Sequence, residues 1–143
     1  MKSLRSILFV SAATLLLATA AVAQAQEAKV AAFIPFDFVV GDHAYPAGEY
    51  SLQSISGDGI VVRIESTDQV ERSNVISHSC TGVLPATKTK MVFRQMGGNM
   101  FLYQVWIEGH LTGREFPKSH AEMRLAEDHE KAKVVIIAAN ISE

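Results

Sequence analysis

The chain has 143 residues, a length that suits one domain, and its 13 basic and 15 acidic residues give a formal net charge of −2. A mildly acidic protein is a poor candidate for binding nucleic acid, because contacts to the phosphate backbone need clustered Lys and Arg. Cys80 is the only cysteine, which excludes a disulfide within this chain, so a hydrophobic core must hold the fold.

The N-terminal region has the layout of a secretory signal peptide. Two basic residues precede an uncharged apolar stretch, residues 7–23, and two small-x-small sites follow within residues 21–25. We expect cleavage after Ala25 or after Ala23. The remaining residues 26–143 form one β-rich domain with a net charge of −4, because 11 basic residues then stand against 15 acidic ones. The alternative is a membrane anchor, since the apolar stretch is near the minimum that spans about 30 Å of hydrocarbon.

Cleavage predicts an exported protein, periplasmic or extracellular, with no membrane span left. The first strand of the exported domain is indicated by the alternation from residue 30 to residue 40, where every even position is apolar. Pro35 cannot donate a ladder hydrogen bond, which favours a sheet edge or a bulge, and Asp37 is expected to point outward. The chain then turns through residues 41–48 into a second strand around Tyr50.

Two glycine-rich turns predict hairpins. Ser56–Gly59 leads into a strand over residues 60–64, and Gly97–Asn99 joins strands over residues 90–95 and 100–107. In the last of these strands the alternation predicts one face made of Phe101, Tyr103, Val105 and Ile107 and another made of Leu102, Gln104 and Trp106.

One helix is expected near the C-terminus. The sequence from Ser119 to Glu122 matches a capping box, and good helix formers follow, so we predict a helix over about residues 119–131 on the surface of the sheet. The apolar run Val134–Ala139 predicts a last strand that is buried on both sides.

These elements predict a mainly β fold, a single antiparallel barrel or sandwich of about seven or eight strands with one helix before the last strand. We favour the barrel, because a buried last strand can close on the first. A barrel of this size either fills its interior with side chains or holds one small ligand.

Three residues, His43, His78 and Cys80, are the candidates for a small hydrolase or a metal-dependent enzyme. A structural zinc site needs four ligands and a catalytic one three. The spacing of His78 and Cys80 on a strand places them about 6.5 Å apart, too far for direct proton transfer. The sequence therefore predicts no catalytic residue, no metal site and no cofactor. It favours a non-enzymatic protein, with the enzyme as the alternative.

Four side chains are candidates for a ligand or surface contact: Arg114, Glu115, Trp106 and His43. Arg114 could bind a carboxylate or a sugar through its planar fork of donors, or it could form a salt bridge, for instance with Asp37, that fixes the helix on the sheet. Trp106 could stack on a sugar ring or belong to the core. The predicted partner is a protein, a glycan or a small apolar ligand.

Three motifs carry a resemblance that covers nearly the whole exported domain. They are IPFDFVVGD at residues 34–42, PAGEY at residues 46–50 and GREFPK at residues 113–118. Together they resemble a group of small exported proteins of soil bacteria, mainly acidobacteria. The resemblance implies export and a compact β-rich fold, and it brings no catalytic residues.

Overall fold

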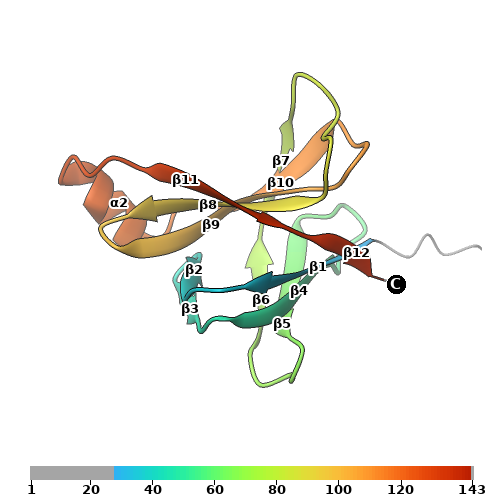
Figure 1. The fold of residues 1–143 in the computed structure, drawn as a ribbon, viewed down its shortest axis with the longest axis horizontal. Helices are drawn as coiled ribbons and strands as arrows, with labels where there is room; N and C mark the ends of the chain where they lie inside the picture. Colours follow the sequence, from blue (N-terminus) through green and yellow to red (C-terminus); the bar gives the residue numbers. More distant parts are fainter. Residues whose placement is uncertain (1–27, 143) are drawn as a thin grey trace, which may run out of the picture.

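The computed structural model describes residues 28–142, so the predicted signal peptide, residues 1–25, lies outside them. Twelve strands and one helix are present in this part of the chain, which is mainly β, as predicted (Figure 1). Sheet A has the order β12 (Asn140–Ser142), β1 (Lys29–Ile34), β4 (Gly48–Ser54), β5 (Val61–Ser66) and β6 (Arg72–Ile76). Sheet B has the order β11 (Lys133–Ala138), β8 (Lys90–Met96), β9 (Asn99–Trp106), β10 (Thr112–Glu115) and β7 (His78–Thr81). In sheet B, β2 (Phe38–Val40) also pairs with β9 and with β3 (His43–Tyr45).

The chain passes from one sheet to the other four times, once through the Pro46–Ala47 turn between β3 and β4 and three times at short corners. These corners are the chief reason why the strands outnumber the predicted seven or eight. The corners are Pro35–Asp37 between β1 and β2, Ser77 between β6 and β7, and Ala139 between β11 and β12. Ser77 is fully buried, and its backbone N–H donates to the Ile60 carbonyl at 2.7 Å. The strand predicted over residues 30–40 is therefore divided into β1 and β2, as happens where strands of a sandwich switch sheets.

The preference for a barrel was wrong, and the alternative, a sandwich, agrees with the structure. Within residues 28–142 no hydrogen-bonded ladder joins sheet A to sheet B. The first strand does pair with the last one, with Val30 opposite Ile141, but the bend at Ala139 keeps this pairing inside sheet A. The two sheets pack face to face, and the chain connects their edges at the corners.

The burial predicted for the run Val134–Ala139 was also wrong. Val134 and Ile136 on β11 are 59% and 56% exposed. Their neighbours Val135 and Ile137 pack against the core. The strand lies at the edge of sheet B, where only one of its faces is covered.

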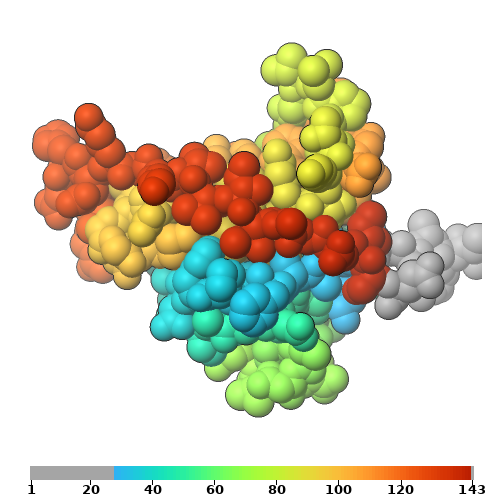
Figure 2. Space-filling model, in the orientation of Figure 1, coloured from blue at the N-terminus to red at the C-terminus, as the bar shows by residue number. Residues whose placement is uncertain are grey.

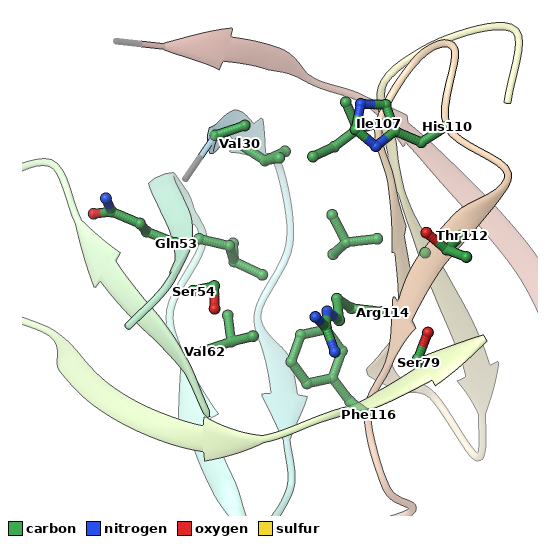
Figure 3. Close-up of a pocket in the computed structure, with 14 residues that line it drawn as sticks. Val30, Gln53, Ser54, Val62, Ser79, Ile107, His110, Thr112, Arg114 and Phe116 are labelled. Carbon is green, nitrogen blue, oxygen red and sulfur yellow. The ribbon is translucent and has the colours of Figure 1, made fainter. Parts of the chain in front are cut away.

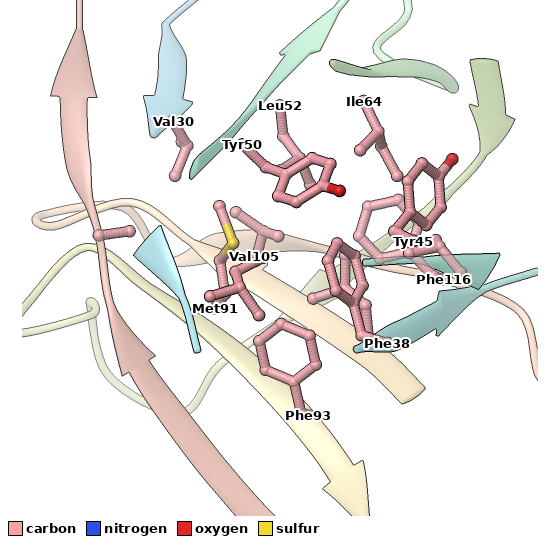
Figure 4. Packing of buried hydrophobic residues seen from close by; sticks show 14 of the residues in the cluster. Val30, Phe38, Tyr45, Tyr50, Leu52, Ile64, Met91, Phe93, Val105 and Phe116 are labelled. Carbon is pink, nitrogen blue, oxygen red and sulfur yellow. The ribbon is translucent and has the colours of Figure 1, made fainter. Parts of the chain in front are cut away.

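The space between the sheets is filled at one end by aromatic rings (Figure 4). Phe38 stacks on Tyr45 at 5.1 Å between ring centroids and meets Tyr50 edge-on at 5.0 Å. Phe93 of β8 closes the group from sheet B, 5.7 Å from Phe38. Each such side chain contributes about 1.5–3 kcal/mol by leaving water, and edge-to-face or offset pairs add to this.

Hydrogen bonds explain two of the sequence motifs. The Tyr50 hydroxyl donates to the Pro46 carbonyl at 2.8 Å, which ties the end of PAGEY to its beginning. The Asp37 carboxylate accepts the Ala47 N–H at 2.9 Å, which joins IPFDFVVGD to PAGEY. These residues therefore fix the corner between the sheets, a structural role that accounts for the motifs without any ligand.

Both predicted hairpins are present, as β4–β5 and β8–β9. The predicted alternation along β9 is wrong, because Val92 pairs with Gln104 and Phe93 with Leu102. Tyr103 is thus an extra residue, a β-bulge. The bulge turns both Leu102 and Val105 toward the core.

The helix α2 (His120–Glu127) is shorter than predicted and begins as the capping box requires. The Ser119 hydroxyl accepts the Glu122 N–H at 3.0 Å, and Asp42 from the β2–β3 turn accepts the His120 N–H at 2.8 Å. The helix lies beside the β8–β9 hairpin (Figure 1). Nowhere in residues 28–142 does a helix reach the length and apolar character that crossing a membrane requires.

Candidate functional site: the hollow between the sheets

At the end opposite the aromatic rings, the two sheets leave a cavity of about 290 Å³ (Figure 3). Its apolar lining comes from both sheets and consists of Val30, Leu52, Val62, Val105, Ile107 and Phe116. Its polar lining consists of Gln53, Ser54, Ser79, His110, Thr112 and Arg114. An apolar hollow with a few converging polar groups is the usual form of a small-molecule site.

The cavity follows from the size of the side chains that point inward. On β5, Val62 faces the cavity, whereas Ile64, two residues further, lies in the filled end. On β1 the cavity end holds Val30 and the filled end holds Ile34. The strands continue past Phe38 and Phe93, and the smaller inward residues Val30 and Val62 leave part of the space unfilled.

Arg114 enters the cavity because of its register in sheet B. It pairs with Val105 of β9 and Ser79 of β7, so its side chain points inward with theirs. Figure 3 shows its guanidinium among the cavity residues. The group lies on Gly59, where an added Cβ would come within 1.7 Å of Nη2. Gly59 therefore allows the positive φ of the hairpin turn, and its lack of a side chain leaves space for the Arg114 guanidinium.

The predicted salt bridge of Arg114 with Asp37 is not formed. Asp37 accepts the Ala47 N–H instead, and no ion pair within the described residues includes Arg114. Its Nη2 donates to the Asp58 carbonyl at 3.3 Å. A hydrogen bond from Ser56 is the main reason why the pKa of the Asp58 carboxyl is lowered, and Arg114 contributes least to that shift. The guanidinium thus keeps donors available for another acceptor.

Glu115 and Trp106 lie on the other face of sheet B. Trp106 Nε1 donates to Gln104 Oε1 at 3.0 Å, and Gln104 Nε2 donates to Glu115 Oε2 at 2.8 Å. The indole ring packs over Gly113, where a Cβ would lie 2.8 Å from it. This hydrogen-bonded chain engages the indole N–H of Trp106 and one carboxylate oxygen of Glu115. The structure therefore separates these two candidates from Arg114.

The candidates for an enzyme do not form a catalytic group. His78 pairs with Glu115, and Cys80 pairs with Gly113, across β7 and β10. Burial raises the pKa of the Cys80 thiol, and the Glu115 carboxylate raises it further. The thiol is therefore protonated at neutral pH, which is unfavourable for a nucleophile.

His43 lies away from both the cavity and the His78–Cys80 strand, beside Glu71 and Tyr45. Its Nε2 is 3.7 Å from Glu71 Oε2, and its ring meets Tyr45 edge-on at 4.7 Å. Within residues 28–142 no group of three or more His, Cys, Asp or Glu side chains could hold a metal ion.

A buried ion pair on the outer face of sheet B escaped the sequence analysis. Arg94 Nε lies 2.7 Å from Glu122 Oε1, and the guanidinium covers the Tyr103 ring at 3.9 Å. The two atoms lack hydrogen-bond geometry, so the attraction is electrostatic. Burial raises the pKa of the Glu122 carboxyl, and Arg94 partly opposes this. The pair attaches α2 to the sheet, which is the task that the sequence had suggested for Arg114.

A second hollow, of about 470 Å³, lies on the outer face of sheet A. It is larger, but its lining is mostly polar and includes Lys29, Glu49, Glu65 and Thr67. Water solvates such a surface well, so the cavity between the sheets is the better candidate. Among the residues that line the cavity between the sheets, Arg114 alone was a predicted contact residue. The i, i+2 spacing of Thr112 and Arg114 was the one signal that could have extended the site.

No protein-family model matches the sequence. Searches of the curated proteins and of the solved structures found no match either. The resemblance to small exported proteins stays a prediction that rests on the three motifs.

Proposed function

We propose that the chain is an exported, non-enzymatic binding protein, and that the cavity between its sheets holds a small, mainly apolar molecule with an anionic group. The observation that carries the proposal is Arg114, whose guanidinium lines an apolar cavity and is paired with no carboxylate of the described residues. Export is inferred from the signal-peptide pattern of the N-terminal region.

The size of the cavity limits the ligand. About 290 Å³ is at the lower end of ligand pockets, which span roughly 300–1,000 Å³. A medium-chain carboxylic acid suits this space. Each methylene group placed against Val30, Val62 and Val105 contributes about 0.8 kcal/mol by leaving water.

The anionic group is expected at Arg114. A guanidinium binds a carboxylate through two parallel N–H···O bonds, and a hydrogen bond to a charged group is worth about 1.5–3 kcal/mol. Thr112 and Ser79 flank Arg114 on the same face of sheet B and can donate from their hydroxyls. These groups would fix the direction in which the ligand enters.

The other functions considered from the sequence receive less support. A hydrolase or metal-dependent enzyme would use His43, His78 or Cys80, which lie apart from the cavity. A glycan platform would use Trp106, whose N–H is engaged by Gln104. The proposal is therefore for binding without turnover. Hydrolysis of a simple ester by the purified protein, lost in Cys80→Ala or His78→Ala, would contradict it.

Calorimetric titration with octanoate tests the role of Arg114. We expect saturable binding by the wild type and an affinity at least about tenfold lower for Arg114→Gln, because the charged hydrogen bonds are lost. Arg63→Gln is the matched control, since it removes the same charge from a strand residue whose Nε contacts Asn74 on the exposed surface. It should bind octanoate within about twofold of the wild type. Equal affinities of all three proteins, or no binding by the wild type, would refute the proposal.

Mass spectrometry tests export and occupancy together. The protein is recovered from the exported fraction of cells that express the whole chain, and its mass is measured under native and denaturing conditions. The denatured mass should correspond to a chain that begins after Ala25 or after Ala23. An excess in the native mass would be a bound molecule, whereas an uncleaved chain found in the cytoplasm would contradict export.

A further inference from the structure

The sheet edges of this protein differ in how well they are protected against pairing with another chain. In the described residues, β3 and β12 are edges of three residues each. The edge strand β7 is polar, with the sequence HSCT, and Arg72 on the edge strand β6 pairs with Glu65. Short length and charged or polar side chains are the common means by which proteins block edge-to-edge association.

The edge strand β11 is less protected, because its one charged residue, Lys133, stands at its first position. It is six residues long, the longest of these edges, and its sequence is KVVIIA. No charged residue occurs from Val134 to Ser142. Val134 and Ile136 expose their side chains along it, and Figure 2 shows this part of the chain as an uncovered red band on the visible face. Uncharged β-branched residues on an open edge favour the addition of another strand.

The hydrogen bonds of β11 show which backbone groups are open. The Ala139 N–H donates to the Thr89 carbonyl at 3.1 Å, and the antiparallel pairing with β8 continues without a register shift. Residues 133, 135, 137 and 139 therefore bond toward β8, because alternate residues of an antiparallel strand bond to the same side. Val134, Ile136 and Ala138 direct their N–H and C=O groups to the open edge.

We propose that β11 is the dimer interface of this protein, pairing with β11 of a second copy about a two-fold axis. With Ile136 opposite Ile136 of the second copy, every open N–H and C=O meets a complementary group, since Val134 then lies opposite Ala138. Sheet B becomes continuous across the two copies. This register follows from the three open residues, whose centre is Ile136.

The side chains fit this pairing as well as the backbone does. The outer face brings Ile136 against its own copy, and the inner face brings Val135 opposite Ile137. Cross-strand pairs of β-branched residues stabilise a sheet. Lys133 lies opposite the uncharged Ala139, so no like charges oppose each other. A second copy therefore offers partners to the open groups of Val134, Ile136 and Ala138, and such a self-complementary patch is what a two-fold interface requires.

The N-terminal segment of this chain is a less suitable occupant. It enters the fold at Ala28, and the first strand residue, Lys29, pairs with Ser142 at the end of β12 that is remote from β11. The expected cleavage would also remove residues 1–25 from the exported protein.

Sedimentation velocity of the exported protein over a range of concentrations tests the proposal. We expect a monomer–dimer equilibrium in the wild type and a dissociation constant at least about tenfold higher in Ile136→Lys, because two like charges then meet at the two-fold axis. The control is Ile76→Lys on the edge strand β6, where the side chain is 57% exposed against 56% for Ile136. It should leave the dissociation constant within about twofold of the wild-type value.

Amide hydrogen exchange of the wild type gives a second readout that does not depend on a variant folding correctly. The Ile136 amide should be protected at high concentration and should exchange at least about tenfold faster when the protein is diluted below the dissociation constant. The Ile137 amide, bonded toward β8, should change little. A monomer at every concentration, a complex with another protein only, an Ile136→Lys variant that still dimerises, or Ile136 exchange that is independent of concentration would overturn the proposal.

Discussion

The two ends of the space between the sheets differ in how they are filled. At one end Phe38, Tyr45, Tyr50 and Phe93 interlock with centroid distances of 5.0 to 5.8 Å. At the other end valines line a cavity of about 290 Å³ into which Arg114 projects. The same strands run through both ends, so the size of the inward side chains makes the difference. We infer that the filled end supplies stability and that the hollow end is free to bind.

Removing a ring from the filled end should have the largest effect. Phe38→Ala is expected to lower the free energy of unfolding by about 3–5 kcal/mol, because the packed neighbours cannot collapse into the space. Phe33→Ala is the control, since Phe33 is 61% exposed, and should cost less than about 1 kcal/mol. Urea unfolding measures both. A small loss for Phe38→Ala would show that the aromatic end does not carry the stability.

Adding a ring should distinguish the two ends on a single strand. Ile64→Phe is expected to cost about 1–3 kcal/mol, because Ile64 is fully buried in the filled end. Val62→Phe should cost less than about 1 kcal/mol, since the new ring can enter the cavity. It should also abolish octanoate binding. Equal losses of stability in the two variants would mean that the cavity is closed in solution.

Deleting one hydroxyl tests the corner that precedes the filled end. Tyr50→Phe retains the ring contacts but removes the donor to the Pro46 carbonyl, so a loss of about 1 kcal/mol is expected. Urea unfolding with an unchanged m-value would assign this loss to the hydrogen bond. An unchanged stability would show that the PAGEY motif does not depend on it.

The smallest effect on stability is expected at Asp42, which lies outside both ends of the space between the sheets. The pKa of the Asp42 carboxyl is lowered from its ordinary 3.8, mainly because the carboxylate accepts a hydrogen bond from the His120 N–H. A hydrogen bond with the His120 side chain lowers this pKa further. A lowered pKa gives stability that is present above pH 3.8 and is lost as the pH falls through the folded value. Asp42→Asn should therefore be less stable than the wild type at pH 6, with a difference that shrinks toward pH 2. A stability difference that stays constant from pH 6 to pH 2 would contradict the hydrogen bonding of Asp42 to His120.

The features that sequence reasoning recovered depend on neighbouring residues. The alternation of residues 30–40 follows from the pleat, Gly97 and Gly98 allow the positive φ of the β8–β9 turn, and Ser119 caps the helix that it precedes. In these cases the physical cause lies within a few residues of its effect. The β-rich class, the hairpins and the start of the helix were therefore predictable.

The features that were missed depend on strands distant in sequence. Nothing local marks Ser77 or Ala139 as a corner, and the extra residue Tyr103 is defined only by its pairing with β8. Residues 134–139 appeared to be buried because an apolar edge strand and an apolar central strand have the same composition. The inward direction of Arg114 is set by Val105, so the cavity could not be assembled from the sequence.

The most direct test of the binding function is an NMR titration of the isotope-labelled protein with octanoate. The account predicts saturable shifts of the amide signals that concentrate at Val62, Thr112 and Arg114, with the aromatic end around Phe38 unchanged. Shifts that are absent, that never saturate, or that concentrate on the outer faces of the sheets would contradict the claim that the hollow end is a binding site.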